Sequence, residues 1–215
     1  MLYIIRHGQT KMNHANVLQG RSDIPLNENG IEQAKEAGQW FLDNGIRFDR
    51  IYSSPLIRAV QTAEYVREVS LSSGPEEQIC EIIADPRLIE MDYGPYEGMD
   101  LKDPAPEVMT FFMDFQNNPA PEGMEPLSEV VRRSGLFLEE ILEEAKSNHI
   151  LISTHAIAMK GLLEYLTPES NGAYWSKYIG NCEVYSSGIR NDYYTVPEPV
   201  FRLNDGIGSP DKRQK

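Results

Sequence analysis

Two histidines follow short apolar segments whose ends would meet at one edge of a β-sheet. The segment LYII (2–5) leads through Arg6 into His7 and Gly8, and the segment ILIST (150–154) leads directly into His155. If both segments are central parallel strands, both imidazoles emerge at the carboxyl edge, where sites form in such sheets. A lone histidine at a strand end is usually structural. A matched pair, with an arginine beside one member, favours a shared site.

Two further charged residues are expected near that edge. Arg58 lies on the first turn or so of the helix that follows the apolar segment RIYSS (50–54). Glu90 lies in RLIEMDYGPYEG (87–98), after an apolar pair and just before a turn rich in glycine and proline. Alone, Arg58 would be interpreted as a solvated helix arginine and Glu90 as an ordinary carboxylate. Together with the histidines they suggest one chemical set.

The cationic members of this set suit a phosphoryl group, whose charge is spread over three oxygens and must be positioned and neutralised. Arg6 and Arg58 offer forked donors that match phosphate oxygens. His155 adds a third cationic donor if it is protonated. The sequence has no cluster with metal-ligand spacing, and these groups would make a metal unnecessary, so we expect neither a metal nor a cofactor.

The remaining members can carry the reaction itself. His7 can attack through a neutral ring nitrogen, provided that a backbone carbonyl fixes the other nitrogen. Gly8 would leave room for the phosphate and for that carbonyl contact. Glu90 could protonate the leaving oxygen.

These residues require elements that hold them at one edge, and the hydrophobic pattern supplies such elements. Strands alternate with helices, which implies an α/β fold: a three-layer sandwich with a largely parallel central sheet flanked by helices. We expect one domain over residues 1–215. The predicted strands are 2–5, 50–54, 150–154, 182–187 and 199–203. The predicted helices are 26–45 with Asn27 as its N-cap, one with Pro55 in its first turn, 128–145, and 157–166. The inward stripes of the second and third helices are Ala59, Thr62, Ala63 and Val66, and Val131, Ser134, Leu138, Ile141, Leu142 and Ala145.

The segment 91–126 interrupts this alternation. It is rich in proline around one short apolar piece, VMTFFMDF (108–115). This composition predicts an excursion from the sheet that contains one helix and forms a pocket wall or a lid. The polar tail from Asn204 is expected on the surface.

Overall composition limits the classes of partner. The chain has 215 residues and a formal net charge of −13, which argues against nucleic acid and anionic membranes because these are normally met by basic faces. An anionic small molecule would need a local basic pocket. The N-terminal apolar run is too short for a signal peptide and no window has the length of a membrane span, so we expect a cytoplasmic protein. The oligomeric state is left open.

Five segments resemble, in the same order, the motifs of the histidine phosphatase superfamily, the phosphoglycerate mutase-like group whose signature is RHG near the N-terminus. The resemblance covers residues 2 to 166, most of the chain, and it implies the phosphoglycerate mutase-like fold. The segments are RHGQTKMN, QGRSDIPLNENGIEQA, YSSPLIRAVQTA, LIEMDYGPYEG and ISTHAIAMKGLL.

The resemblance also implies roles for individual residues. By it, His7 is the phosphohistidine nucleophile and Glu90 the proton donor. The other implied site residues are Arg6, Arg58 and His155 in the phosphate pocket, Asn13 as a further phosphate contact, and Gln19, Gly20 and Arg21 at the entrance. Two positions depart from the family pattern: Met12 stands where tryptophan is common, and Ala156 follows His155 where glycine is usual. A positive φ at Ala156, or crowding of the phosphate by its methyl group, would impair the pocket.

The family contains mutases, which return the phosphoryl group to a bound intermediate, and phosphatases, which pass it to water. Mutase-like members carry an arginine-containing insertion after the position of Glu90, whereas residues 91–126 contain Lys102 as their single basic residue. We therefore predict a phosphatase that acts on small-molecule phosphate monoesters. The aromatic residues of this segment either face the substrate or pack the excursion onto the body. A cofactor-dependent phosphoglycerate mutase is the alternative, and a phosphate-binding or interaction module without turnover is a third interpretation.

Overall fold

A six-stranded, mostly parallel sheet forms the centre of the computed structural model, which describes residues 1–72 and 80–203. Its strand order is β3-β2-β4-β1-β5-β8. The first four strands run parallel, β5 is antiparallel to β1, and β8 is antiparallel to β5. The strands are β1 (Leu2–Arg6), β2 (Arg50–Ser53), β3 (Ile82–Ala84), β4 (Ile150–Thr154), β5 (Val184–Ser187) and β8 (Glu198–Phe201), with a separate pair β6 (Ile189–Arg190) and β7 (Tyr193–Tyr194). The predicted fold class is confirmed, and the tail from Asn204 lies outside the described residues.

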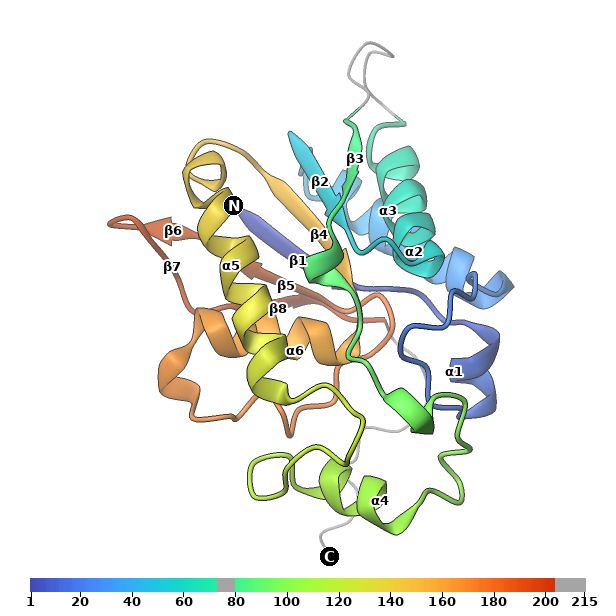
Figure 1. Cartoon of the computed structure of the whole chain (residues 1–215). Helices are drawn as coiled ribbons and strands as arrows, with labels where there is room; N and C mark the ends of the chain where they lie inside the picture. Colours follow the sequence, from blue (N-terminus) through green and yellow to red (C-terminus); the bar gives the residue numbers. More distant parts are fainter. Residues whose placement is uncertain (73–79, 204–215) are drawn as a thin grey trace, which may run out of the picture.

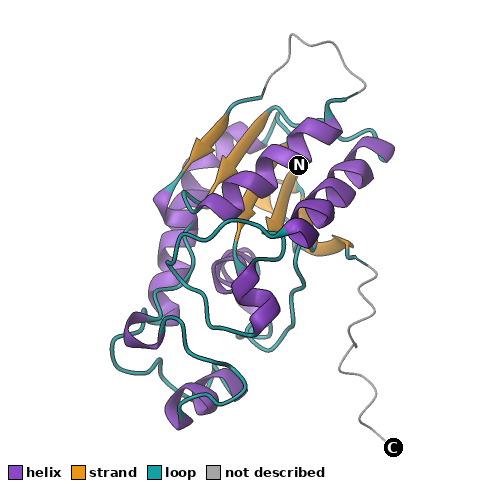
Figure 2. Cartoon of the chain, turned by 90° about the vertical axis from the view of Figure 1, so that its right-hand side faces the viewer, coloured by secondary structure: helices purple, strands orange, loops and turns teal. Residues whose placement is uncertain are grey.

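Helices cover both faces of this sheet (Figures 1 and 2). α2 (Glu28–Asp43) and α3 (Ile57–Ser70) pack on one face, and α5 (Leu127–Ala145) and α6 (Ala156–Leu166) on the other. The shorter elements are α1 (Lys11–Ala15), α4 (Pro106–Met113) and the 3₁₀ turns η1 (Pro86–Leu88), η2 (Gly94–Tyr96) and η3 (Pro168–Ser170). Within the described part of the chain, no helix is both long enough and apolar enough to span a bilayer.

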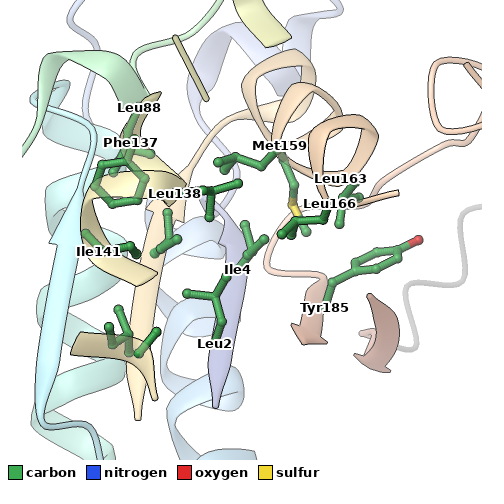
Figure 3. Packing of buried hydrophobic residues seen from close by; sticks show 14 of the residues in the cluster. Leu2, Ile4, Leu88, Phe137, Leu138, Ile141, Met159, Leu163, Leu166 and Tyr185 are labelled. Carbon is green, nitrogen blue, oxygen red and sulfur yellow. The ribbon is translucent and has the colours of Figure 1, made fainter. Parts of the chain in front are cut away.

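The central position of β1 explains why its residues 2–5 are all apolar or aromatic. Leu2 and Ile4 face the cluster formed with α5 and α6, which Figure 3 shows from close by, whereas Tyr3 and Ile5 face the cluster formed with α2 and α3. Successive side chains of a strand point to opposite faces, so a strand covered on both sides needs apolar residues at every position. Packing on both faces thus fixes where β1 ends, at Arg6.

The inward face of α5 differs by part of a turn from the predicted stripe. Val131 and Leu142 are half-buried, whereas Val130 and Phe137 are fully buried. Val130 packs with residues of the excursion, while Phe137 packs on the sheet. The helix therefore buries two faces against two different neighbours, and a single-stripe reading of its sequence misses one of them.

The hydrophobic pattern of the sequence does not predict the short elements β3 and α1. The edge strand β3 has three residues, and the five-residue helix α1 is held by a capping box between Thr10 and Asn13. Pro55 lies before the start of α3 at Ile57 rather than in its first turn. In contrast, Asn27 caps α2 as predicted, because its side chain accepts the N–H of Gly30 at 2.8 Å.

The excursion contains one α-helix, α4, and lies beyond the lower edge of the sheet in Figure 1. Its apolar side chains share a third cluster with Ile157 of α6 and with Trp175. It also joins the segment after α1, since Leu18 exchanges backbone hydrogen bonds with Met99 at 2.8 Å and Gly98 at 2.9 Å. Most of its aromatic side chains therefore pack the excursion onto the body.

Candidate active site

The ends of β1 and β4 bring the two predicted histidines together. Arg6 pairs with Thr154 in the parallel register, so the next residue along each strand, His7 and His155, lies at the same level. The His7 N–H donates to the carbonyl of Thr154 at 2.9 Å, and the two imidazole centroids are 5.1 Å apart. His7 is 3% exposed and His155 is 0% exposed. The predicted shared edge is where both rings lie.

The hydrogen bonds of His7 define its tautomer. Nδ1 lies 2.7 Å from the carbonyl oxygen of Gly8, and Nε2 lies 3.2 Å from Nε of Arg58. A carbonyl oxygen only accepts and an arginine N–H only donates. Nδ1 therefore carries the proton and the lone pair of Nε2 faces the arginine. Fixing of one ring nitrogen by a backbone carbonyl matches the arrangement expected for an attacking histidine.

Gly8 is needed for close packing as well as for space at the site. A Cβ on Gly8 would collide with the carbonyl oxygen of Gly30, and a Cβ on Gly30 would lie 2.7 Å from the Gln9 nitrogen. The first turn of α2 therefore touches the backbone directly after His7. This contact with α2 is a further reason for glycine at position 8, beside the room for phosphate and for the carbonyl contact that the sequence predicts.

Arg58 is fully buried, which excludes the interpretation of a solvated helix arginine. Its guanidinium donates to the carbonyls of Ser22 at 2.7 Å and Gly20 at 2.6 Å, in addition to His7. Burial lowers the pKa of Arg58 to about 10, and the nearby carboxylates of Glu90 and Glu97 oppose that shift. The side chain is still a cation at pH 7, held without a direct carboxylate partner among the described residues.

Arg6 is held by the segment that precedes β5. Its NH1 donates to the carbonyl of Ile179 at 2.6 Å, and its buried Nε has no hydrogen-bond partner within residues 1–72 and 80–203. The side chain of Asn181 donates to the carbonyl of His7 at 2.9 Å. This segment positions both residues of the Arg6-His7 pair.

His155 resembles His7 in burial and charge state. Its Nε2 is 2.7 Å from Oγ of Ser54, and its buried Nδ1 has no partner in the described part of the chain. Burial, with Arg58 as the next cause, holds the pKa values of both imidazoles well below the ordinary value. Both rings are therefore neutral at pH 7 in this arrangement, and a phosphate anion between them would favour their protonated forms.

Glu90 lies at the N-terminus of α6, beside His155. Its carboxylate accepts backbone N–H groups of Met91 at 2.8 Å, Ala158 at 3.0 Å and Ile157 at 3.2 Å. Three donors fix the orientation of this buried group. Ala156 is the first residue of α6 and is not among the positive-φ residues, so alanine meets no backbone strain there.

The residues expected at the entrance have mixed environments. Asn13 accepts the N–H of Thr10 through Oδ1 at 3.1 Å, which leaves its NH₂ group for a ligand. Gln19 accepts from Thr10 Oγ1 at 2.7 Å, while its buried Nε2 has no partner among the described residues. Gly20 contributes its carbonyl to Arg58. Arg21 is half-exposed and pairs with Asp92 at 2.9 Å and Glu125 at 3.6 Å, so it ties its loop to the excursion.

Three residues that support the site were missed by sequence reasoning: Ser54, Asn181 and Glu97. Ser54 directly follows β2, at the edge already assigned to the site, so its position was an available signal. Asn181 is 174 residues from His7, and no local pattern relates the two. Glu97 was read only as part of a turn, yet it accepts hydrogen bonds from the loop that holds Arg58.

The profile of the histidine phosphatase superfamily (branch 1) matches residues 2–198. The chain belongs to this superfamily, whose members are phosphatases or mutases. It is 33% identical over 171 residues to a 2,3-bisphosphoglycerate-dependent phosphoglycerate mutase of Parvibaculum lavamentivorans, covering 77% of this chain and 79% of the relative. It is 34% identical over 152 residues to fructose-2,6-bisphosphatase TIGAR B of Danio rerio, covering 69% of this chain and 55% of the relative.

Solved structures give the same result for the fold. A mutant phosphoserine phosphatase of Entamoeba histolytica, in complex with phosphoserine, superposes with a TM-score of 0.72 at 25% identity and covers 93% of this chain and 94% of that chain. Members similar to this chain therefore include a mutase, a bisphosphatase and a phosphoserine phosphatase.

Proposed function

We propose that the chain is a metal-independent phosphatase that hydrolyses small-molecule phosphate monoesters in the cytoplasm through a phosphohistidine on His7. The observation that carries this proposal is the state of the His7 ring. Its Nδ1 is fixed by the Gly8 carbonyl at 2.7 Å, and its Nε2 presents a lone pair in a buried, cationic environment. That is the state an attacking imidazole requires.

In the first step, the Nε2 lone pair attacks phosphorus and the bond from phosphorus to the ester oxygen breaks. Arg6, Arg58 and His155 surround the oxygens on which the negative charge lies. Arg58 Nε, which now donates to Nε2, would turn to a phosphate oxygen. Glu90, held by three N–H groups beside His155, donates a proton to the leaving oxygen.

In the second step, water replaces the leaving alcohol. Glu90, now ionised, accepts a proton from the water, which attacks phosphorus while the phosphorus–Nε2 bond breaks. Inorganic phosphate is released, and His7 returns to its neutral form with the proton still on Nδ1. The same carboxyl group is acid in one step and base in the next.

The composition of the excursion favours water, rather than a bound intermediate, as the acceptor of the phosphoryl group. Lys102, the single basic residue of 91–126, is exposed, and Arg133, which reaches towards the excursion, is paired with Glu125 at 2.8 Å. Arg133 therefore supplies no free cation for a substrate carboxylate, and Lys102 is the single basic side chain that this segment itself could offer. We propose that this segment forms a wall or lid of the substrate pocket. The second candidate, a phosphoglycerate mutase, is favoured by the 33% identity to the Parvibaculum enzyme.

The nucleophile is tested by trapping. Brief incubation with a ³²P-labelled phosphate ester and quenching in alkali should leave acid-labile label on the protein. His7→Ala should abolish the label and the turnover, whereas His14→Ala, a change at an exposed position of α1, should retain both. Labelling that persists in His7→Ala would refute the assignment. Absence of label and turnover in the natural chain, with any phosphate ester, would favour the non-catalytic interpretation.

The acceptor is tested by comparing two rates on the same preparation. Phosphate release from p-nitrophenyl phosphate, phosphoserine and sugar phosphates is measured beside interconversion of 3- and 2-phosphoglycerate with added 2,3-bisphosphoglycerate. A phosphatase should release phosphate from several esters and interconvert the phosphoglycerates slowly. Fast interconversion with little hydrolysis would replace the phosphatase by the mutase.

A further inference from the structure

The carboxylate of Glu97 organises the loop that follows Leu18. It accepts three consecutive backbone N–H groups, from Gly20 at 3.0 Å, Arg21 at 3.1 Å and Ser22 at 3.1 Å. Successive N–H groups that converge on one anion form a nest. Glu97 is the C-cap residue of η2 and lies in the excursion. It is 77 residues from Gly20 along the chain, so this contact joins two distant segments.

The opposite side of the same loop holds Arg58. The carbonyls of Gly20 and Ser22 accept from its NH2 and NH1 at 2.6 and 2.7 Å, and its Nε then donates to Nε2 of His7 at 3.2 Å. The loop thus turns its N–H groups towards an anion and its carbonyls towards a cation. Aligned hydrogen bonds of this kind polarise and strengthen one another.

Close packing at Gly20 restricts the conformation of the loop formed by Gly20, Arg21 and Ser22. A Cβ on Gly20 would lie 2.6 Å from the carboxylate of Glu97 and 2.8 Å from the carbonyl of Met91, so the backbone approaches the excursion too closely for a side chain. Arg58 has no other described hydrogen-bond acceptors than these two carbonyls and His7.

We propose that Glu97 is a positioning residue, which aims the Arg58 guanidinium at the phosphate site by holding the nest formed by Gly20, Arg21 and Ser22. Without it, the two carbonyls rotate and Arg58 loses the geometry for a forked contact with phosphate. The inference rests on the roles proposed above for His7 and Arg58. Its test includes a measurement that needs no turnover.

The variants separate charge, reach and geometry. Glu97→Ala removes the acceptor, and Glu97→Asp retains the charge on a shorter side chain. Gly20→Ala keeps the carboxylate but disturbs the nest. Glu107→Ala is the matched control, because Glu107 is an exposed glutamate of the same excursion that accepts only from Tyr96 Oη, at 3.0 Å.

The first readout is the titration of the His7 ring, followed by NMR of ¹³C/¹⁵N-histidine protein and assigned with a His7→Gln sample. The ionisable groups around this ring are Arg6 from β1, Arg58 from α3, His155 after β4 and Glu90 beside α6. Loss of the cation from Nε2 should raise the pKa of His7 by about one unit in Glu97→Ala and Gly20→Ala. Removal of a carboxylate, by itself, acts in the opposite direction, so a rise reports displacement of Arg58.

The second readout is catalysis and anion binding. Glu97→Ala should lower kcat/KM by about 100-fold, as expected for a misplaced group that contacts the transition state, and should weaken inhibition by inorganic phosphate. Glu97→Asp should recover part of this loss, and Glu107→Ala should match the natural chain. Thermal unfolding gives the folded fraction of each variant.

Two results would overturn the proposal. One is an unchanged His7 titration in folded Glu97→Ala. The other is a loss of activity in Glu97→Ala that equals the unfolded fraction of the variant, while the folded fraction keeps the natural pH profile. In that case Glu97 would stabilise the fold without positioning Arg58. If the natural chain proves inactive on all esters, the proposed function fails, and the ring titration still decides the role of Glu97.

Discussion

At the scale of single residues, this molecule places ionisable groups where water is excluded. His7, Arg58, Glu90 and His155 are at most 3% exposed, and backbone groups rather than opposite charges satisfy most of them. Such an arrangement leaves the charges available to a ligand, because no carboxylate within residues 1–72 and 80–203 pairs directly with Arg6 or Arg58. Burial also holds the pKa values of His7 and His155 well below the ordinary value, so both imidazoles resist protonation.

Lys160 extends this property beyond the proposed catalytic set. It is buried in α6, donates to the carbonyl of Trp175 at 2.7 Å and lies 5.1 Å from the ring centroid of Phe115. Burial, and then the charge of Arg6, lower its pKa to about 8 from an ordinary 10.5. Between these pH values the unfolded chain binds more protons at this position than the folded chain does. The free energy of unfolding should therefore rise with pH across that window.

We predict that Lys160→Met removes this rise. A shift of this size corresponds to about 3 kcal/mol between pH 8 and 10.5, while the lost hydrogen bond to Trp175 costs about 1 kcal/mol at all pH values. Urea unfolding at pH 7, 8, 9 and 10 gives the two slopes. Lys102→Met, at an exposed lysine, is the control and should keep the slope of the natural chain. Parallel curves for Lys160→Met and the natural chain would contradict the prediction.

At the scale of elements, the site depends on a helix that contributes none of its charged groups. The N-terminal turn of α2 touches the backbone after His7 through the Gly8 and Gly30 contact, and Gln9 is held by Gln33 of the same helix, whose Oε1 accepts its N–H at 2.8 Å. Movement of α2 therefore moves the strand end that carries the imidazole.

We predict that Gly30→Ala lowers both stability and kcat. The added methyl group would meet the backbone of Gln9, and overpacking of this kind costs about 1–3 kcal/mol. Because the displaced backbone adjoins His7, kcat should fall more than the loss of folded protein explains. Gly188→Ala is the control, since its Cβ would meet only ordinary contacts at 3.5 Å. Thermal unfolding and steady-state kinetics measure both effects, and a variant with lower Tm but natural kcat would disprove the coupling.

The elements also show what the sequence could and could not predict. The strands that end at Arg6 and Thr154 follow from apolar runs of the right length, and they placed both histidines correctly. The contacts of Asn181 with His7 and of Glu97 with Gly20 join positions 174 and 77 residues apart. Such contacts depend on how loops dock after the sheet has formed, and no local periodicity records them.

At the scale of the whole molecule, the charge of the surface opposes the charge of the site. The chain carries a formal net charge of −13, while the site's arginines are withdrawn from solvent: Arg58 is buried and Arg6 is half-buried. An anionic substrate approaching through solvent meets the field of the surface first, and the arginines act only at short range. Capture of substrate should therefore depend on direct contact in the pocket rather than on long-range steering.

We predict that kcat/KM for a dianionic phosphate ester does not increase as ionic strength is lowered. At about 10 mM salt the screening length is about 30 Å, compared with about 10 Å at 100 mM, so more of the negative surface acts on the approaching dianion. The rate constant should stay level or fall at low salt. Phosphocholine, whose quaternary ammonium group offsets part of the phosphate charge, should vary less and serves as the control substrate. A several-fold increase at low salt for the dianion alone would show that a basic funnel guides the substrate, and would contradict an acidic approach to a buried cationic site.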